Sequence, residues 1–396
     1  MAHDMTVTER EHRTFLQTYK RLAIEVDHAN GMYVHTTDGR RYLDFLGGIA
    51  VNTAGHSHPR VIDAIQRQMG RYMHVSNYFY QDAQVEFVER LCAMTGYARA
   101  FLSNSGAEAN EGAMKFARSH GSSRQKREII GFSGGFHGRT YGVLSIMDKP
   151  LYKEGMGPFV PDTRVLPFND VNALREAIGT ETCAVFVEFL QGEGGVRWAT
   201  EEFIVELFRL RDEFSFLIIA DEVQTGGGRT GRFAAFERFG ARPDIVTLAK
   251  GIGGGLPLGA MLVSEELSDV WTSGRHGTTF GGNAVACAAG SVILDLIQEG
   301  LGRHAEEVGD YMMTTFQSIA SETPHLVRDV RGAGAIAGIE LSVPAMPYVE
   351  RMLERGVIIN ATAETVLRFL PPLIFTKKNV DEVAVALRMA LAVPVS

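Results

Sequence analysis

Short runs of consecutive apolar residues alternate along the chain with segments in which apolar residues recur every three or four positions. The short runs are 100–102, 128–132, 183–187, 216–220 and 245–248. Runs of this kind indicate strands buried on both faces, and the helical segments between them supply the crossovers of a parallel sheet. Helical spacing is clear at 60–70 and 84–95. The pattern predicts an α/β fold with a mainly parallel central sheet.

The pattern of apolar residues is different at the two ends of the chain. Near the start, residues 32–34 and 41–45 flank an Asp38-Gly39 turn and predict a hairpin. From about residue 284 a long helical stretch leads to predicted strands at 330–341 and 357–360 and a closing amphipathic helix at 380–392. We therefore expect residues 56–284 to form a large domain. We expect 1–55 and 285–396 to form a smaller α+β domain together.

Each of the five predicted central strands is followed by a polar or glycine-rich loop. These loops begin at Ser103, Ser133, Glu188, Asp221 and Lys250. Ligands of open α/β sheets bind outside the carboxyl ends of the strands. The sequence therefore predicts one site that the five loops share.

The composition is that of an ordinary soluble enzyme. Of 396 residues, 45% are hydrophobic and 22% charged, and the net charge is −8. An acidic chain with scattered Lys and Arg argues against nucleic acid or an anionic membrane as a partner. The cysteines, Cys92, Cys183 and Cys287, form no CxxC pair, which argues against a disulfide framework or a structural metal. With no apolar leader visible, a cytoplasmic location is expected.

Lys250 stands apart among the eight lysines. It follows the apolar run 245–249 and precedes a glycine-rich segment, whereas the other lysines lie in polar surroundings. Desolvation at such a position lowers the pKa of a lysine and makes the neutral amine available as a nucleophile. On its own, Lys250 is better explained as a lysine that extends its charge into solvent at a strand end.

Asp221 presents a carboxylate at the end of the buried run 216–220. A buried acid needs a cation, and a protonated pyridine nitrogen is one such cation. A turn cap or a pairing with a nearby arginine is the plainer explanation. Ser105 and Gly106 open a predicted helix, whose free N–H groups favour a phosphate, although an ordinary N-cap looks the same.

Arg139 and Arg368 are candidates for binding a carboxylate. Arg139 lies in one of the strand-end loops, and Arg368 lies in the apolar segment 365–370. A planar guanidinium binds a carboxylate through two parallel hydrogen bonds, which suits an enzyme that orients an amino or oxo acid. A structural ion pair accounts for either arginine equally well.

Two short motifs point to other enzyme classes. Residues 226–231 match the dinucleotide pattern GxGxxG but lie beyond the strand end without the acidic residue that the pattern requires later. Residues 131–135 match the hydrolase pattern GxSxG, with Ser133 as nucleophile, but glycines follow where a helix is needed. A serine hydrolase that uses Ser133 remains the alternative from another class. A non-catalytic binding protein would not need Lys250 and Asp221 at matching strand ends.

Taken in order and at matching spacing, six motifs resemble those of the class III aminotransferases, which are fold-type-I pyridoxal-phosphate enzymes. The resemblance runs from 42–52 to 368–369, nearly the whole chain. The motifs are Asn104-Ser105-Gly106, Phe136-His137-Gly138-Arg139-Thr140, Gln191-Gly192-Glu193-Gly194-Gly195, Asp221-Glu222-Val223-Gln224, Lys250 and Thr278-Thr279-Phe280-Gly281-Gly282-Asn283. The resemblance implies a large domain with a mainly parallel sheet and a smaller α+β domain.

The resemblance also implies roles for single residues. Lys250 would form a Schiff base with pyridoxal 5'-phosphate and move the substrate proton, and Asp221 would pair with the pyridine nitrogen. Other cofactor contacts are implied for Ser105, Gly106 and Ala107 at the phosphate, Phe136 and Val223 on the ring faces, Gln224 near the phenolic oxygen and Thr279 at the phosphate of the neighbouring subunit. A site completed in this way implies a homodimer.

Substrate contacts are implied for Arg139 at a substrate carboxylate, Arg368 at the α-carboxylate of glutamate, Glu193 as the group that neutralises Arg368, and Thr278. Two positions depart from the family pattern. Ala107 stands where threonine is frequent, which a backbone contact tolerates. Phe189 stands where proline is usual, and we expect it to reshape the loop before Gln191.

The implied reaction passes the ω-amino group of N2-acetyl-L-ornithine to 2-oxoglutarate, as in arginine biosynthesis. Succinylornithine, N-acylated lysine, ornithine and 4-aminobutyrate are alternative donors of the same chemistry. One methylene group changes binding in a pocket by only ~1–3 kcal/mol, so the motifs do not separate these donors.

Overall fold

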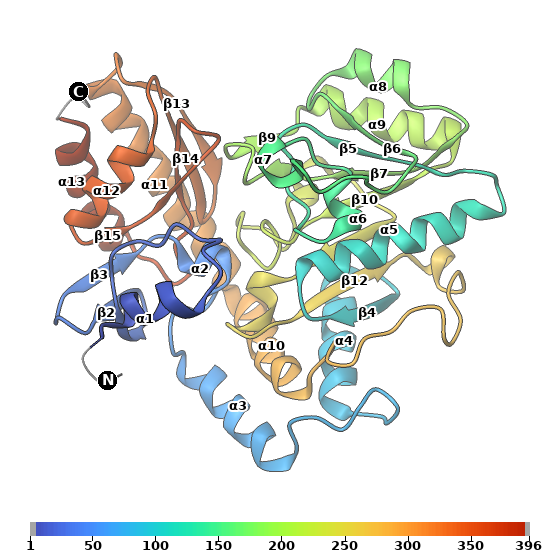
Figure 1. Ribbon diagram of the computed structural model, residues 1–396, viewed down its shortest axis with the longest axis horizontal. Coiled ribbons are helices and arrows are strands. Elements are labelled where there is room, and N and C mark those ends of the chain that lie inside the picture. The colour runs from blue at the N-terminus through green and yellow to red at the C-terminus, as the bar shows by residue number, and fades with distance from the viewer. Residues whose placement is uncertain (1–4, 393–396) are drawn as a thin grey trace.

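The structure is a computed structural model that describes residues 5–392. Its largest sheet has seven strands in the order β4-β12-β11-β10-β7-β5-β6 (Figure 1). The strands from β11 to β6 are parallel, and β12 runs antiparallel to both of its neighbours. The bounds are β4 (Arg99–Ser103), β5 (Glu128–Phe132), β6 (Thr163–Leu166), β7 (Thr182–Val187), β10 (Leu217–Asp221), β11 (Ile245–Leu248) and β12 (Gly259–Val263).

Helices cover both faces of this sheet, as continuous apolar strands require. Ile219 and Ile245 pack on one face against α5 (Gly106–Ser122), which presents Ala113 and Phe116. Alternate residues such as Ile218 pack on the other face with α4 (Asp82–Thr95), α9 (Glu201–Phe214) and α10 (Ala284–Leu296). The predicted mainly parallel α/β sheet is confirmed.

Two four-stranded sheets bring the ends of the chain together. The first has the order β1-β2-β3-β15 and the second the order β13-β14-β17-β16. In Figure 1 the N-terminal strands, in blue, lie beside the C-terminal elements, in orange and red. The bounds are β1 (Val26–Asn30), β2 (Tyr33–Thr36), β3 (Arg41–Asp44), β13 (Val327–Ala333), β14 (Ile336–Leu341), β15 (Val357–Ile358), β16 (Asn360–Thr362) and β17 (Val366–Phe369).

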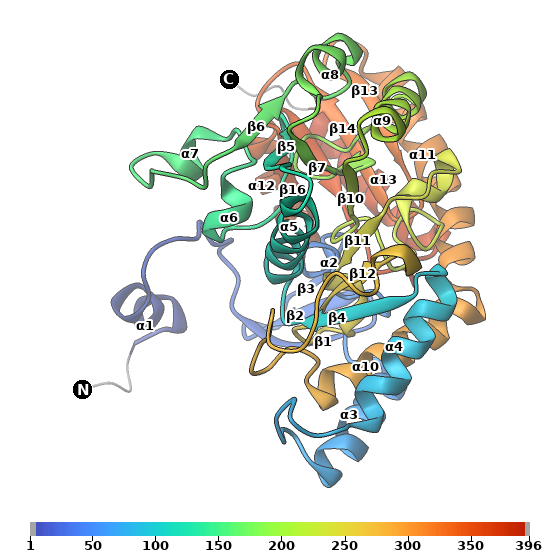
Figure 2. The same ribbon diagram turned by 90° about the vertical axis from the view of Figure 1, so that its right-hand side faces the viewer.

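The remaining elements connect or cover these sheets (Figure 2). The two-stranded sheet β8 (Leu190–Gln191) and β9 (Arg197–Trp198) follows β7. The other helices are α1 (Val7–Thr14), α2 (Gly47–Ala50), α3 (Pro59–Arg71), α6 (Tyr141–Leu144), α7 (Pro150–Lys153), α8 (Val171–Ala177), α11 (Gly302–Glu322), α12 (Met346–Glu354) and α13 (Lys377–Leu391).

Most predicted elements are present, and six strands were missed. The five predicted central strands, the hairpin β2–β3 and the helices α3, α4 and α13 match the sequence pattern. The strands β1, β6, β8, β9, β12 and β17 were not predicted. The predicted segments 330–341 and 357–360 each contain two strands, because the chain turns at Gly334 and passes between sheets at Ile359.

One helical segment of the described chain, Ala284–Glu322, is long and apolar enough to cross a membrane by length and composition alone. The core helix of a soluble protein passes the same test. In this structure α10 packs against α3 and α4, and Ala289 and Ile293 are fully buried. These contacts account for the apolar composition of the segment.

Arg229 ties the loop after β10 to the C-terminal elements, and we expect its loss to destabilise the fold. It is 2% exposed, and its Nη1 donates hydrogen bonds to the carbonyl oxygens of Ala335, at 3.0 Å, and Pro371. Arg229→Met leaves both carbonyls unsatisfied, each at about 1–3 kcal/mol. Denaturant titration should therefore give a loss of about 2–6 kcal/mol. The exposed Arg67→Met should change stability by no more than about 0.5 kcal/mol; equal losses for both would contradict this account.

Candidate functional site

The carboxyl ends of the central strands bring the predicted site residues together. Asp221 is the last residue of β10, and Lys250 follows β11. The loop after β5 carries Phe136 and His137, and Glu188 follows β7. Adjacent parallel strands end at the same edge of the sheet, so these residues surround one point, as the sequence predicted.

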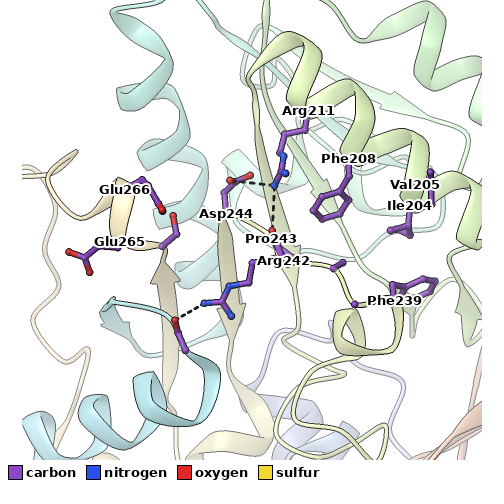
Figure 3. A pocket seen from close by; sticks show the side chains of 14 residues that line it. Ile204, Val205, Phe208, Arg211, Phe239, Arg242, Pro243, Asp244, Glu265 and Glu266 are labelled. Atoms are coloured by element: carbon purple, nitrogen blue, oxygen red, sulfur yellow. Dashed lines mark hydrogen bonds and ion pairs between the residues drawn. The ribbon is translucent and has the colours of Figure 1, made fainter.

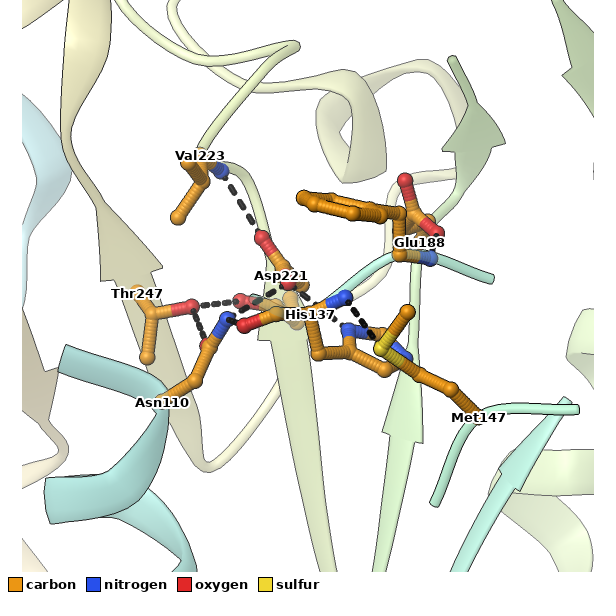
Figure 4. Close-up of polar contacts among 9 residues, drawn as sticks. Asn110, His137, Met147, Glu188, Asp221, Val223 and Thr247 are labelled. Atoms are coloured by element: carbon orange, nitrogen blue, oxygen red, sulfur yellow. Dashed lines mark hydrogen bonds and ion pairs between the residues drawn. The ribbon is translucent and has the colours of Figure 1, made fainter. Parts of the chain in front are cut away.

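Asp221 accepts hydrogen bonds from three groups in a buried polar network (Figure 4). Its Oδ2 accepts hydrogen bonds from Nδ1 of His137 at 2.8 Å and Nδ2 of Asn110 at 2.7 Å. Its Oδ1 accepts one from the backbone N–H of Val223 at 3.0 Å. The Thr247 hydroxyl donates to Oδ1 of Asn110 at 2.6 Å and so fixes the orientation of that amide. The carboxylate is thus fixed in one orientation, with negative charge at the strand end.

His137 and Glu188 extend this network. Burial opposes a charged imidazole, but the hydrogen bond and charge of Asp221 raise the pKa of His137 overall. Glu188 Oε2 accepts a hydrogen bond from the Phe136 N–H at 2.9 Å, and burial raises the pKa of Glu188 above its usual range. Glu188 therefore lies in surroundings that favour its neutral form more than water does.

Lys250 occupies a strained and desolvated position. Its φ of 45° lies in the left-handed region that residues other than glycine rarely adopt. Burial lowers the pKa of Lys250, while the charges of Asp221 and Glu193 act in the opposite direction. The net effect makes a neutral amine more available than in an ordinary lysine.

The N-terminus of α5 faces the same site. Ser105 is its N-cap, and the Ser105 hydroxyl accepts a hydrogen bond from the Glu108 N–H at 3.2 Å. The N–H groups of Gly106 and Ala107 in the first turn have no partner within the helix. A Cβ added to Gly106 would lie 2.5 Å from Cγ1 of Val223, so the helix end approaches Val223 closely. An anion would be favoured there.

Arg368 is fully buried and already paired. Its Nη1 lies 2.7 Å from Oε1 of Glu193 and donates a hydrogen bond to Oε1 of Gln224 at 3.1 Å. Its Nε donates to Oδ1 of Asn360 at 3.2 Å. Burial works against the charged form of Glu193, but Arg368 holds the pKa of Glu193 below its usual value. Arg368, Glu193 and Gln224 therefore form one cluster; the sequence analysis related Glu193 to Arg368 but assigned Gln224 to the cofactor.

Arg139 is exposed and lies on aromatic rings. Its guanidinium carbon is 3.5 Å from the ring centroid of Tyr152 and 5.8 Å from that of Phe136. Within residues 5–392 the structure gives Arg139 no ion pair and no hydrogen bond. Its donors are therefore available to a ligand, in contrast to those of Arg368.

Thr278 and Thr279 differ in their surroundings. The Thr278 hydroxyl accepts hydrogen bonds from Nδ2 of Asn104 at 3.3 Å and from the Gly281 N–H at 3.2 Å, so it shapes its own loop. Thr279 is exposed, next to Phe280, whose side chain is 60% exposed. The structure brings Thr278 next to the loop before α5 but gives Thr279 no contact with the site.

Ser133 lacks the surroundings of a catalytic serine. Its Oγ accepts a hydrogen bond from the Phe168 N–H at 3.1 Å, and the residues that follow form a loop rather than a helix. Phe189 is fully buried and packs against Phe236 and Phe239. The ring of Phe189 therefore lies in the core.

Sequence reasoning gave no role to His137, Asn110, Glu188 or Thr247. Each lies next to a residue that was singled out: His137 and Glu188 in strand-end loops, Asn110 one turn into α5, and Thr247 in the buried strand β11. The usable signal was the presence of polar residues at strand ends and on the buried face of a helix. Their convergence on Asp221 depends on tertiary structure.

A surface groove lies away from this site (Figure 3). It has a volume of about 810 Å³ and is lined by Phe208 and Arg211 of α9, by Arg242 and Asp244 before β11, and by Glu265 after β12. These residues lie at the amino ends of β10 and β11, the edge of the sheet opposite Asp221. The groove contains none of the predicted site residues.

Comparison with known proteins gives consistent matches over nearly the full length. Residues 15–391 match the family described as aminotransferase class III. Relatives named acetylornithine aminotransferase include those of Methanocaldococcus jannaschii, 44% identical over 95% of this chain and 96% of the relative, and Aquifex aeolicus, 39% identical over 95% and 99%. The solved ornithine aminotransferase of Toxoplasma gondii has a TM-score of 0.93 at 30% identity, covering 97% of this chain and 93% of that chain.

Proposed function

Because the chain belongs to the class III aminotransferases, we propose that it transfers the ω-amino group of N2-acetyl-L-ornithine to 2-oxoglutarate. The products are N-acetylglutamate 5-semialdehyde and glutamate. The observation that carries this proposal is the contrast between the free Arg139 and the Glu193-paired Arg368, in a chain whose relatives at 38–44% identity are named acetylornithine aminotransferase.

Class III aminotransferases depend on pyridoxal phosphate, and the site fits that group. Asp221 offers a fixed negative charge for the pyridine nitrogen, Lys250 an amine for the aldehyde carbon, and the α5 N-terminus N–H groups for the phosphate. Phe136 and Val223 would hold the ring faces, and Gln224 would lie beside the phenolic oxygen. When bound, pyridoxal phosphate supplies an electron-withdrawing ring that stabilises negative charge on the substrate carbon.

Lys250 is the residue that we assign to proton transfer. Its Nζ would take the proton from the carbon that carries the transferred amino group and deliver it to C4′ of the cofactor. A lowered lysine pKa suits this role, because the neutral amine must be available near the operating pH. Asp221 keeps its charge oriented through His137 and Asn110 while the proton moves.

Arg139, Arg368 and Glu193 would let one site accept two different acids. Arg139 would bind the carboxylate of the ω-amino donor, which leaves Arg368 paired with Glu193. When glutamate or 2-oxoglutarate binds, its α-carboxylate would replace Glu193 at the Arg368 guanidinium. A planar guanidinium accommodates either carboxylate with the same geometry.

A homodimer would complete the site. Tyr78, Phe79 and Tyr80 are 95%, 65% and 105% exposed, and Asn77 beside them donates hydrogen bonds to the carbonyl oxygens of Thr278 and Gly281. Exposed apolar residues in such numbers mark a protein contact surface. Thr279 on this surface would reach the phosphate in the neighbouring subunit.

The pathway, the cellular location and the domain boundaries are part of the same proposal. We place the enzyme in arginine biosynthesis in the cytoplasm. We divide the chain into a large cofactor-binding domain, 56–284, and a small domain built from 1–55 and 285–396. The sheet that pairs β3 with β15 supports the joining of the two chain ends.

The visible absorption spectrum of the purified protein tests the proposed reaction. With pyridoxal phosphate bound, the protein should be yellow, lose that absorption with N2-acetylornithine, and regain it with 2-oxoglutarate. A yellow protein that ignores acetylornithine but responds to succinylornithine, an N-acylated lysine, ornithine or 4-aminobutyrate would keep the chemistry and change the donor. A protein that does not take up the cofactor would refute the proposal.

Gly106→Ala should weaken cofactor binding. The added Cβ would lie 2.5 Å from Cγ1 of Val223 and would force the N-terminus of α5 away from Val223, the residue expected to face the cofactor ring. Gly112→Ala, on the same helix, is the matched control, because its nearest neighbour, Nε2 of His276, is 3.5 Å away. Gly112→Ala should stabilise the protein by about 0.5–1 kcal/mol. Equilibrium titration with pyridoxal phosphate should show a higher Kd for Gly106→Ala alone, and equal Kd values would contradict the close approach.

The rate of cofactor uptake by the cofactor-free protein should rise with pH as Lys250 loses its proton. Because burial lowers the pKa of Lys250, the midpoint should lie below the ordinary lysine value of 10.5. Asp221 raises that pKa by its charge, so Asp221→Asn should move the midpoint to still lower pH. Stopped-flow absorbance would measure both midpoints. A wild-type midpoint at or above 10.5, or an upward shift in Asp221→Asn, would contradict this prediction.

A further inference from the structure

Arg139 needs a support that fixes its orientation, because no charged or hydrogen-bonding partner within residues 5–392 does so. A free arginine side chain samples many rotamers, and ordering it upon ligand binding costs conformational entropy. An arginine that is already held in place avoids much of that cost. The residue in contact with the guanidinium is Tyr152 of α7.

The contact between Arg139 and Tyr152 is a stacking contact. The guanidinium carbon lies 3.5 Å from the ring centroid, so the cation lies directly over the ring face. Stacking of this kind uses the face of the guanidinium and leaves its N–H groups free at the edge. Those N–H groups are the ones that bind a carboxylate through two parallel hydrogen bonds.

Tyr152 is itself held in place. Phe136 meets it edge to face, with ring centroids 6.1 Å apart and an interplanar angle of 84°. The next residue, Lys153, donates a hydrogen bond from Nζ to the Met147 carbonyl oxygen at 2.8 Å, which anchors α7 to the chain after α6. Tyr152 therefore connects Arg139 to Phe136, the residue expected to face the cofactor ring.

We propose that Tyr152 is a positioning residue that holds Arg139 ready for the carboxylate of the amino donor. This inference rests on the function proposed above. The donor half depends on the Arg139–Tyr152 stack for its carboxylate, whereas glutamate has a second carboxylate that would bind Arg368, so the glutamate half depends less on the stack.

The experiment compares Tyr152→Phe, which keeps the ring, with Tyr152→Leu, which removes it. Phe159→Leu is the matched control, because Phe159 belongs to the same aromatic region but contacts Tyr141 and Lys153 rather than Arg139. Binding of N-acetyl-L-norvaline, which has the donor's carboxylate but no ω-amine, is measured by calorimetry on the cofactor-loaded protein. KM and kcat are measured separately for acetylornithine and glutamate.

Tyr152→Leu should raise the Kd of N-acetyl-L-norvaline and the KM of acetylornithine about threefold to tenfold. Tyr152→Phe and Phe159→Leu should stay within about twofold of the wild type, and in Tyr152→Leu the glutamate KM should rise less than the acetylornithine KM. If Tyr152→Leu does not fold, Tyr152→Met supplies the same loss of the ring with a longer side chain.

Two outcomes separate this inference from the proposed function. Arg139→Lys is included because lysine cannot form the bidentate contact. If Arg139→Lys raises the acetylornithine KM but Tyr152→Leu does not, the role of Tyr152 is wrong and the proposed function stands. If Arg139→Lys leaves acetylornithine binding unchanged, the proposed donor contact itself is wrong. An equal rise for glutamate in Tyr152→Leu would indicate a general structural effect and would also overturn the inference.

Discussion

Lys250→Ala should abolish covalent attachment of the cofactor and lower kcat on the order of 10⁴-fold. The variant loses the group that we assign both to covalent binding and to proton transfer. No other lysine is placed to replace it, because the chain has only eight and none of the other seven lies at the carboxyl end of a strand of the central sheet. Pyridoxal phosphate should still bind, more weakly, through Asp221 and the α5 N-terminus.

Borohydride reduction followed by mass spectrometry measures the covalent link directly. The wild type should gain the mass of the cofactor on the peptide that contains Lys250, and Lys250→Ala should gain none. Lys115→Ala is a suitable control, because Lys115 is exposed and its Nζ contacts only Nδ1 of His276. Cofactor mass on another peptide of Lys250→Ala, together with retained activity, would overturn the assignment.

Arg368→Ala should impair the half-reaction with glutamate and leave the half-reaction with the amino donor largely intact. A buried, hydrogen-bonded charge pair typically contributes 2–5 kcal/mol or more when one partner is removed, so glutamate binding should weaken about 30-fold or more. The donor half should change much less, because the donor carboxylate would contact Arg139. Glu193 would be left without its partner, so the pKa of Glu193 should rise.

Single-turnover spectra with acetylornithine and with glutamate would measure the two halves separately. Arg368→Ala/Glu193→Ala removes the unpaired carboxylate and tests whether it disturbs the donor half. Arg197→Ala is a matched control, because Arg197 pairs with Glu340 at a half-exposed position outside the site. Equal losses in both halves of Arg368→Ala would argue against a separate glutamate contact.

The sequence predicted the central strands because burial on both faces leaves a strong pattern. β7 and β10 are buried at every position and are apolar except at Thr182 and Asp221, the terminal residues that carry polar side chains. β6 lies at the edge of the sheet, and only one of its four residues is buried. β12 follows an apolar, glycine-rich loop, so the change from loop to strand leaves no mark in the sequence pattern. Its antiparallel direction depends on its neighbours, β11 and β4, and not on its own residues.

The site also contains residues that the sequence pattern identifies and residues that only the tertiary structure brings together. Asp221 and Lys250 could be identified from sequence because each ends an apolar run, where a charged residue is conspicuous. The network that orients Asp221 could not, because His137, Asn110 and Thr247 come from three different elements and are ordinary polar residues in isolation. The stacking of Arg139 on Tyr152 likewise depends on how α7 folds back, for which the sequence contains no local signal.

The pairing of β3 with β15 sets an order of events during synthesis of the chain. β3 is made among the first residues, but its parallel partner Val357–Ile358 leaves the ribosome only after almost all of the chain. Until then one edge of β3 has unpaired N–H and C=O groups. Such an edge can form hydrogen bonds with a strand of another chain. The large sheet, whose strands all precede residue 264, can form earlier. We therefore expect β3 to depend on protection by chaperones for most of translation.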